Sequence, residues 1–299
     1  MKKIYILTAI IVLAVNGFGQ FDETKTEINQ NVSVPTLNST QLNNLGVKAI
    51  TANGDAELGV TYFEKAIDAN ARCLECRINL GRAKMRLGKQ EEAIELFNKI
   101  LQTNPNSSET YSSLGEAYND LGKSKQALKS LERAIDLGAD DNFTLTNYAI
   151  ALNNEREYKK ALKYLDKAIE IDPGIAETHT NRGTVLFNMG KVKESLESLK
   201  TAEKLNPNNS TISNNLGVVY DKLGKDKLAQ KYYQTAVELD PSFGIAQYNL
   251  AASYLERGKR TEAYQGLNML KSLDNNLADE LQQMIWGKFV VNISTRKIR

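Results

Sequence analysis

The chain has 299 residues, with 38 basic and 36 acidic side chains and a formal net charge of +2. The two signs are mixed along the sequence, so the positive stripe that nucleic-acid-binding proteins use is not visible. The length alone suggests about two ordinary domains, but that expectation fails if the chain is built from repeats.

The first 19 residues have the pattern of a secretory signal peptide. Lys2 and Lys3 precede an apolar run at 4–15, which is too short to cross a hydrocarbon core about 30 Å thick as a helix. Gly17 and Gly19 then supply small residues before a cut after Gly19. The alternative is an uncleaved N-terminal anchor. The pattern predicts export to the periplasm or the cell surface, with no membrane span in the mature chain.

The rest of the sequence changes character near residue 40. Residues 20–39 are polar and lack periodicity, which predicts a mobile leader. Residues 40–277 repeat every 34 residues, and Arg156 and Ala139 stand in the gaps inside the glycine and proline series. The periodic residues are Gly54, Gly88, Gly122, Gly190, Gly224 and Gly258, and Pro105, Pro173, Pro207 and Pro241.

Each repeat is predicted to form two helices. Apolar residues recur at helical spacing on both sides of the periodic glycine. The glycine lies where the first helix must end, because a left-handed residue costs glycine least. The proline follows the second helix, which it cannot continue. The predicted class is therefore all-α.

These motifs resemble the tetratricopeptide repeat family, whose pattern is Leu-Gly, Tyr, Ala, Phe, Ala and Pro. The unit at 210–243 shows it with a tyrosine at the Phe place: Leu216-Gly217, Tyr220, Ala229, Tyr233, Ala236 and Pro241. The resemblance implies a right-handed superhelical solenoid of seven helix-turn-helix units. The units are 40–73, 74–107, 108–141, 142–175, 176–209, 210–243 and 244–277.

The two ends depart from the pattern, as the end units of solenoids often do. In the first unit Gly46-Val47 stands where Leu-Gly is expected, and Gly59 stands for Ala. In the last unit Leu270 and Asn275 replace Ala and Pro. Residues 278–299 are predicted to supply a capping helix at 278–288 and a frayed tail at 289–299.

Asparagine recurs at the sixth place of the units, although it is a mediocre residue inside a helix. The seven residues at this place are Leu45, Asn79, Ser113, Asn147, Asn181, Asn215 and Asn249. The resemblance implies that this place faces the concave side, where an amide could pair with the donor and acceptor of a ligand peptide group. The alternative is that each amide bonds locally to neighbouring helices.

The same face is expected to carry Phe187 and Tyr248 as further peptide-binding residues, within a neutral surface that also includes Phe143 and Ile150. The only basic candidates are Lys48, Arg82 and Arg86, and acidic residues lie near them in sequence: Glu75, Glu109, Glu116 and Asp120. A clamp for a C-terminal carboxylate is therefore not expected.

Cys73 and Cys76 form a CxxC motif where the second unit begins. In an exported protein this motif predicts a structural disulfide, and a redox-active pair is the alternative. Haem attachment needs a histidine where Arg77 stands, and zinc needs further ligands nearby.

No catalytic motif is present, and His179, the only histidine, occupies a packing position. The sequence therefore predicts a non-enzymatic scaffold without a cofactor, which binds an extended peptide segment of a protein partner and no nucleic acid. Two alternatives stay open. One is a structural part of a cell-envelope assembly that uses the convex face or the ends, and the other is thiol-disulfide exchange through the CxxC.

Overall fold

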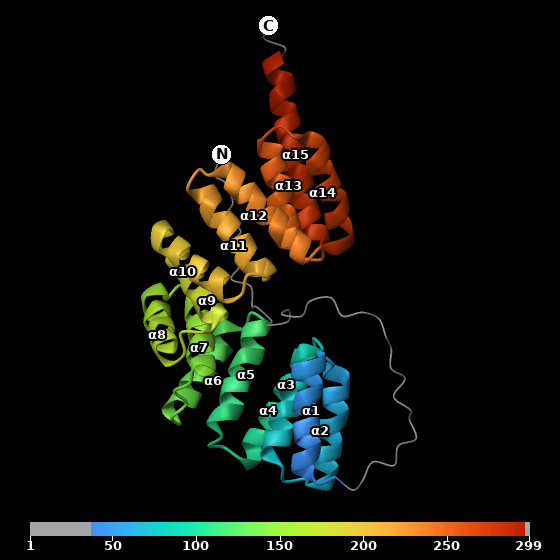
Figure 1. Ribbon diagram of the computed structural model, residues 1–299, viewed down its shortest axis with the longest axis vertical. Helices are drawn as coiled ribbons and strands as arrows, with labels where there is room; N and C mark the ends of the chain where they lie inside the picture. The colour runs from blue at the N-terminus through green and yellow to red at the C-terminus, as the bar shows by residue number, and fades with distance from the viewer. Residues whose placement is uncertain (1–36, 297–299) are drawn as a thin grey trace. The chain divides into compact units, whose positions relative to one another are not determined.

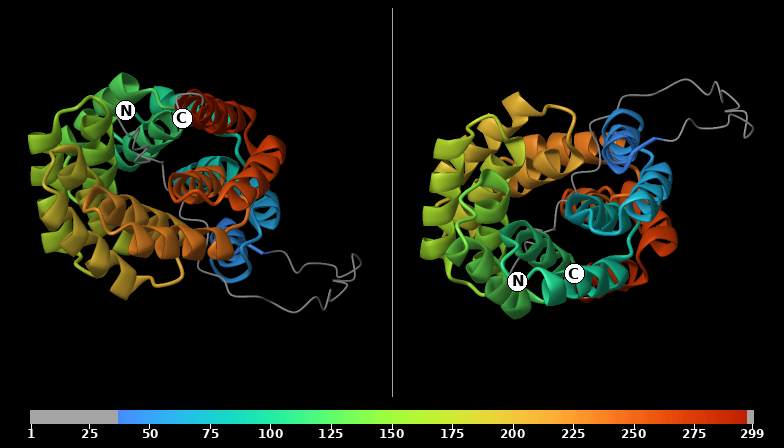
Figure 2. Two further views of the ribbon diagram at one scale, coloured as in Figure 1. Left: turned by 90° about the horizontal axis from the view of Figure 1, so that it is seen from above. Right: turned by 90° about the horizontal axis from the view of Figure 1, so that it is seen from below.

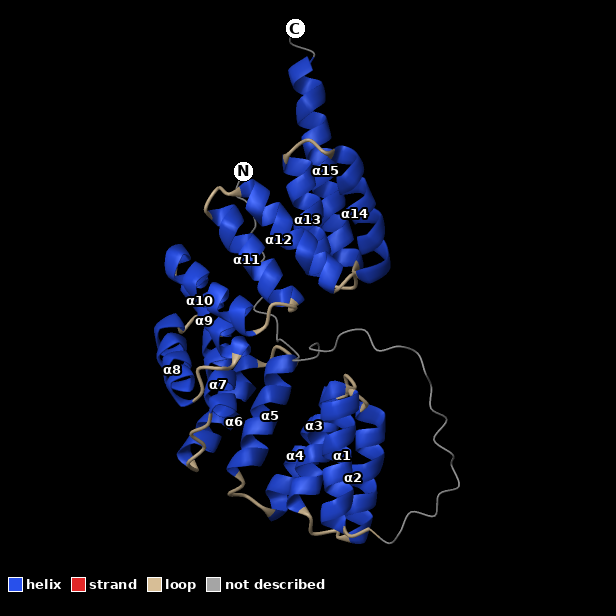
Figure 3. Ribbon diagram, viewed as in Figure 1, coloured by secondary structure: helices blue, strands red, loops and turns tan. Residues whose placement is uncertain are grey.

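The computed structural model describes residues 37–296, all of them in helices and their connections (Figure 1). Fifteen helices and no strand occur in this part of the chain, which confirms the all-α prediction (Figure 3). The signal peptide and most of the expected leader lie outside the described residues. The chain divides after Pro173 into two units, each built from helix pairs.

Residues 37–173 contain four helix pairs, and residues 174–296 contain three pairs and a last single helix. The first unit holds α1 (Ser39–Asn53), α2 (Ala56–Ala69), α3 (Leu74–Arg86), α4 (Gln90–Thr103), α5 (Ser108–Asp120), α6 (Ser124–Asp136), α7 (Asn142–Asn154) and α8 (Tyr158–Ile171). The second holds α9 (Ala176–Asn188), α10 (Val192–Leu205), α11 (Ser210–Lys222), α12 (Asp226–Leu239), α13 (Gly244–Glu256), α14 (Arg260–Leu273) and α15 (Asn275–Arg296).

Each unit has two layers. The two helices of a pair pack on each other, and the second helix also packs on the first helix of the next pair. First helices contact one another as well, in the order α1, α3, α5, α7 in one unit, and between α9 and α11 in the other. Figure 2 shows the helices of each unit stacked in chain order. This is the all-α solenoid that the 34-residue period predicts.

Glycine packing holds the two helices of a pair together. A Cβ added to Gly81 would lie 2.4 Å from the ring of Phe97, and one added to Gly115 would lie 2.3 Å from Leu131. The absent side chain therefore lets a large residue of the second helix pack against the backbone of the first. The same pairing joins Gly183 to Leu199.

The left-handed turns lie where the period places them. All six periodic glycines have positive φ, and Arg156 adopts φ 63° at the seventh turn. Gly138, outside this series, has φ 92° and ends α6, where the amide of Ala139 donates to the carbonyl of Ala134 at 3.0 Å. A glycine therefore ends this helix where the sequence lacks the periodic proline.

The Leu-Gly motif of α1 is shifted by one residue from the sequence alignment, whereas Phe63 of α2 keeps its place 34 residues before Phe97. Gly46 packs against Phe63, just as Gly81 packs against Phe97, so Leu45-Gly46 is the Leu-Gly motif of this pair. The assignment of Gly46-Val47 to that place is wrong, because α1 has 15 residues whereas α3 has 13. Asn44, not Leu45, therefore occupies the sixth place.

The ends of the helical region also differ from the expected boundaries. Asn38 caps α1 and Leu37 packs against the first core cluster, so the leader stops short of residue 39. The last helix runs from Asn275 to Arg296, longer at both ends than the expected 278–288. The tail expected to fray is helical as far as Arg296.

Candidate peptide-binding site

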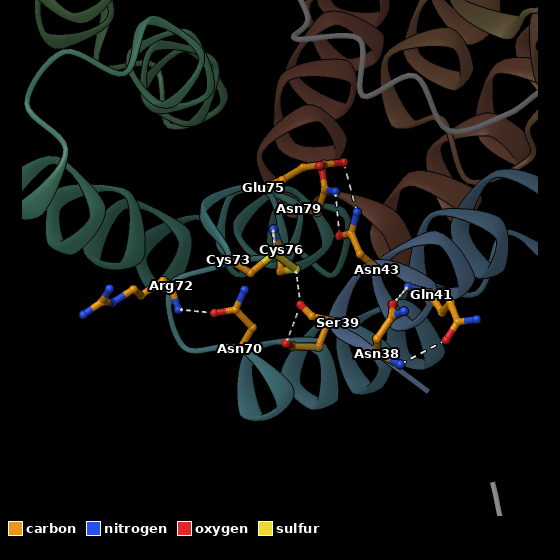
Figure 4. The surroundings of a disulfide bond; sticks show 11 residues. Asn38, Ser39, Gln41, Asn43, Asn70, Arg72, Cys73, Glu75, Cys76 and Asn79 are labelled. Atoms are coloured by element: carbon orange, nitrogen blue, oxygen red, sulfur yellow. Dashed lines mark hydrogen bonds between the residues drawn. A yellow bond between two sulfur atoms is a disulfide. The ribbon is translucent and has the colours of Figure 1, made fainter. Parts of the chain in front are cut away.

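Two of the periodic asparagines bond to the preceding helix pair. The amide nitrogen of Asn79 donates to Oδ1 of Asn43 at 3.0 Å, and Asn43 in turn donates to Glu75 at 3.0 Å (Figure 4). Asn249 makes the same bond to Oδ1 of Asn214 at 2.9 Å. Asn43 lies three residues before Gly46, and Asn214 lies three residues before Gly217, so the two bonds are equivalent.

Other asparagines at this place are also engaged locally. The side-chain nitrogen of Asn147 donates to the main-chain carbonyl of Phe143 at 3.1 Å. The main-chain carbonyl of Asn147 accepts from the side chain of Asn119 at 2.9 Å. Asn215 is buried, and the amide of Asn214 lies 3.5 Å from its Oδ1. The hydrogen bonds of these residues match the local alternative rather than a row of amides open to a ligand.

Asn181 differs from the other periodic asparagines. Its side-chain nitrogen is buried and has no hydrogen-bond partner among the described residues. A buried donor without a partner lowers stability by about 1–3 kcal/mol. Of the five predicted asparagines, Asn181 is therefore the one whose side-chain nitrogen is buried without a hydrogen-bond partner among the described residues.

The two predicted aromatic residues lie in packed surroundings. Phe187 is partly buried against the core cluster of α9–α12. Tyr248 is 3% exposed, and its hydroxyl donates to Glu280 of α15 at 3.2 Å. Burial raises the pKa of Tyr248, and the charge of Glu280 raises it further. A peptide-binding role for Tyr248 does not fit this structure, because the capping helix contacts its hydroxyl and shares its core cluster.

A cluster of four side chains within residues 37–173 was not predicted from the sequence. We term it the Arg82 platform, and it consists of Arg82, Glu109, Ser113 and Phe143. Arg82 of α3 donates through Nε to Ser113 and through Nη1 to Glu109 of α5, both at 2.9 Å. Its guanidinium lies 5.6 Å from the ring centroid of Phe143 of α7. One side chain thus links the first helices of three consecutive pairs.

The electrostatics of the Arg82 platform exclude a strong anion site. Glu109 forms an ion pair with Arg82, so the guanidinium charge is balanced. Phe143 is 36% exposed beside it. The platform therefore offers an aromatic surface next to a fixed guanidinium, with little net charge.

A sequence signal for this cluster existed. Glu109 and Phe143 are 34 residues apart, so they occupy the same place in consecutive repeats. Arg82 was among the basic candidates and Phe143 among the surface residues. What the sequence did not show is that the long arginine side chain reaches across α5 to connect them.

A buried carboxyl lies at the end of α5. Asp120 is partly buried, and Oδ2 has no hydrogen-bond partner among the described residues. Desolvation raises the pKa of Asp120 to about 6, and a hydrogen bond with Gln90 partly opposes this.

Cys73 and Cys76 form a disulfide at the start of α3, with their Cα atoms 5.4 Å apart (Figure 4). Cys73 is the N-cap residue, and its Sγ accepts from the amide of Cys76 at 3.2 Å. Cys76 is fully buried with Leu42 and Ala66. Ser39 Oγ lies 3.4 Å from Cys76 Sγ and donates to the carbonyl of Ala66 at 2.8 Å. The disulfide therefore lies where α1, α2 and α3 meet.

Two properties of the described residues bear on function. They contain no cluster of His, Cys, Asp and Glu arranged to hold a metal ion. None of the helices in the described part of the chain combines the length and the apolar character that a membrane span requires.

Family models match most of the repeat region. "Tetratricopeptide repeat" matches residues 51–114 and again residues 113–174. "Psidin, N-terminal TPR repeats region" matches residues 150–276. No curated protein matches the chain in sequence.

Solved structures share the fold at low identity. A chain of the APC/C hetero-tetramer Cut9-Hcn1 is 16% identical, with a TM-score of 0.67 over 72% of this chain and 43% of that one. PilF of Pseudomonas aeruginosa is 20% identical, with a TM-score of 0.57 over 71% of this chain and 97% of that one. The human IFIT1 dimer with PPP-AAAA is 22% identical, with a TM-score of 0.64 over 82% and 64%.

Proposed function

Because the chain belongs to the tetratricopeptide repeat family, whose members bind protein or peptide partners, we propose that it is a non-enzymatic scaffold for an extended peptide segment. The segment lies along the first helices of residues 37–173 and contacts the Arg82 platform. The observation that carries this proposal is the exposed ring of Phe143 beneath a guanidinium that Ser113 and Glu109 already hold in place.

The chemistry of the platform favours an uncharged segment with an apolar side chain. Phe143 gives that side chain a surface to cover, and aromatic anchors contribute strongly to binding when they become buried. Arg82 has five N–H donors, of which Ser113 and Glu109 receive bonds from Nε and Nη1. A further N–H serves a peptide carbonyl without the conformational cost of ordering a free arginine.

Export is part of the proposal, since it rests on the N-terminal sequence pattern. Cleavage after Gly19 would deliver the mature chain to the periplasm or the cell surface, where a disulfide between Cys73 and Cys76 would persist. The intact mass of the protein from its native host tests this, and retention of Met1 would contradict it.

The peptide site is tested with a random-peptide display selection on the purified chain. Enriched peptides are then measured by fluorescence anisotropy against Phe143→Ala and Arg82→Gln. We expect each variant to weaken binding by about 1–2 kcal/mol, roughly tenfold, and the enriched peptides to share an apolar residue.

Matched control variants are Ile171→Ala and Arg133→Gln, which change an exposed aliphatic and an exposed cationic residue on second helices. Both should bind like the original chain. Peptides that bind the Phe143→Ala and Arg82→Gln variants unchanged would contradict the proposed site. So would a selection that enriches nothing.

A further inference from the structure

The first helix pair, α1–α2, is joined to the rest of its unit through α3. Both helices of this pair pack on α3, whereas the α3–α4 and α5–α6 pairs each lie between two neighbouring pairs. Two apolar clusters form the junction with α3. One is built around Phe63, and the other contains Leu42, Ala66 and Cys76. The second cluster includes a disulfide sulfur, so the state of the disulfide bears on how the first pair is held.

The buried sulfur of the disulfide lies against both helices of the first pair (Figure 4). Cys76 is fully buried, and its Sγ lies 3.4 Å from Oγ of Ser39 in α1. Ser39 in turn donates to the main-chain carbonyl of Ala66 in α2 at 2.8 Å. A movement of this sulfur therefore disturbs α1 and α2 together.

The disulfide also orders the first turn of α3. Sγ of Cys73, the N-cap residue, accepts from the amide of Cys76 at 3.2 Å. The same turn carries Glu75, whose carboxylate accepts from Asn43 of α1 at 3.0 Å. The two cysteines are three residues apart, so their bond constrains the unfolded chain less than a long-range disulfide does. Its effect on the fold therefore lies mainly in this turn and in what the turn holds.

The two sulfurs differ in their access to a reductant. Cys73 is partly buried, whereas Cys76 is fully buried. The thiolate of a dithiol therefore attacks Sγ of Cys73, forms a mixed disulfide with it and expels Cys76 as a thiolate. The position of Cys76 in the first turn of a helix favours that negative charge.

The second thiol of the same reductant completes the exchange. It attacks the reductant's own sulfur in the mixed disulfide and releases Cys73. The dithiol becomes a disulfide, and its two electrons and two protons pass to Cys73 and Cys76. The reaction needs no co-reactant beyond a dithiol.

Reduction changes the junction in two ways. Each sulfur gains a hydrogen and the two are no longer bonded, so two thiols need more space than one disulfide, although Cys76 has no free space around it. The released Cys73 side chain also turns toward solvent, which leaves the amide of Cys76 without its acceptor. The first change loosens the contact with Ser39, and the second frays the turn that presents Glu75 to Asn43.

We propose that Cys73 and Cys76 form a redox switch. The disulfide holds α1–α2 on α3, and reduction by a dithiol releases this pair while α7 and α8 stay folded. The first pair is then a removable cap, because its release uncovers the apolar residues of α3 that it covers. The chain is a substrate of thiol exchange in this proposal and not its catalyst. The switch uses none of the residues of the Arg82 platform and does not depend on it.

The experiment measures amide hydrogen exchange of the purified full chain before and after treatment with dithiothreitol. We expect the amides of α1 and α2 to exchange at least about tenfold faster after reduction, and those of α7 and α8 to keep their rates. Equal exchange of α1 and α2 in the two states would overturn the proposal. So would faster exchange in every helix, or a disulfide that dithiothreitol leaves intact in the folded chain.

Two controls separate the switch from other effects of the reductant. Cys73→Ser/Cys76→Ala cannot form the bond, so its α1 and α2 should exchange faster than those of the oxidised chain and should not respond to dithiothreitol. A response of this variant to dithiothreitol would contradict the role of the cysteines. Brief treatment with glutathione, followed by acid and peptide mapping, should place the adduct on Cys73. An adduct on Cys76 would overturn the proposed route of attack.

Discussion

Arg156 adopts a left-handed backbone conformation, with φ 63°, at the turn between α7 and α8. The corresponding turns of the other pairs use glycine. For a residue with a Cβ this conformation costs about 1–2 kcal/mol. The packing of the surrounding helix pair offsets this local cost.

Arg156→Gly should raise the free energy of unfolding by about 0.5–1 kcal/mol, since part of the gain is lost to the greater freedom of glycine in the unfolded chain. Urea denaturation measures it. The reverse exchange, Gly122→Arg, should lower the free energy of unfolding by a similar amount. No steric clash adds to this backbone cost, because nothing lies within 4 Å of a Cβ at Gly122. Equal stabilities for the original chain and both variants would contradict the backbone argument.

Asp120 should make stability depend on pH. Its folded pKa of about 6 lies above the ordinary value of 3.8, so the folded chain holds a proton that the unfolded chain releases in between. The contribution of this carboxyl to stability is therefore full below about pH 4 and is lost as pH rises through about 6.

Asp120→Asn should unfold at a higher temperature than the original chain at about pH 8, and the difference should shrink toward pH 4. The expected gain is about 1–2 kcal/mol after allowance for the part of the group that solvent reaches. Asp136→Asn, on an exposed position of α6, serves as the control across the same pH series. A pH-independent difference between Asp120→Asn and the original chain would exclude the carboxyl as its source.

At the scale of the helix, two of the periodic asparagines link consecutive pairs. Asn79 bonds to Asn43 and Asn249 bonds to Asn214, each across the contact between two pairs. Asn214 is fully buried, so its carbonyl oxygen depends on this donor. At Asn79 and Asn249 the link therefore gives asparagine a structural use at a place where helix propensity disfavours it.

Asn249→Ala should lower stability by about 1–2 kcal/mol, because the buried oxygen of Asn214 loses its partner. Asn181→Ala should leave stability unchanged or raise it, since it removes a buried donor that has no partner. Thermal unfolding of both variants measures the contrast. If both keep the original stability but lose affinity for the selected peptides, the asparagines serve a ligand rather than the fold.

The sequence predicted the helices well because two residue types repeat with one period. It predicted Arg156 at a glycine turn, but it misplaced the Leu-Gly motif of α1 by one residue, because the period alone does not show the longer α1. Gly46 packing on Phe63 reveals the shift. A capping helix was expected, yet its pattern did not show that α15 would engage Tyr248.

The candidate site was less predictable than the fold. Arg82 and Phe143 were both named, but their contact depends on how three successive helix pairs rotate and on the rotamer of a long side chain. Neither quantity follows from the period. The hydrogen bonds of the asparagines were likewise open in the sequence, because a side-chain amide serves a neighbouring helix and a ligand with the same atoms.

For the whole molecule, the near-neutral composition does not show how charge is distributed locally. Glu109 balances Arg82 within one cluster, whereas the two halves of α15 carry opposite charge over a single helix. The net charge of +2 reports neither arrangement. Partner preference in this chain therefore belongs to particular faces rather than to its overall charge.

The stacking of neighbouring helices also bears on how the chain is made. The helix contacts described above join elements that are adjacent or next but one along the chain. A chain delivered from its N-terminus, at a ribosome or a membrane pore, therefore never waits for a distant strand or helix to complete a core. Within each unit, each arriving helix covers part of the apolar face left by the one before it. Maturation can proceed vectorially, with only the newest pair exposed to chaperones or proteases until α15 covers the last face.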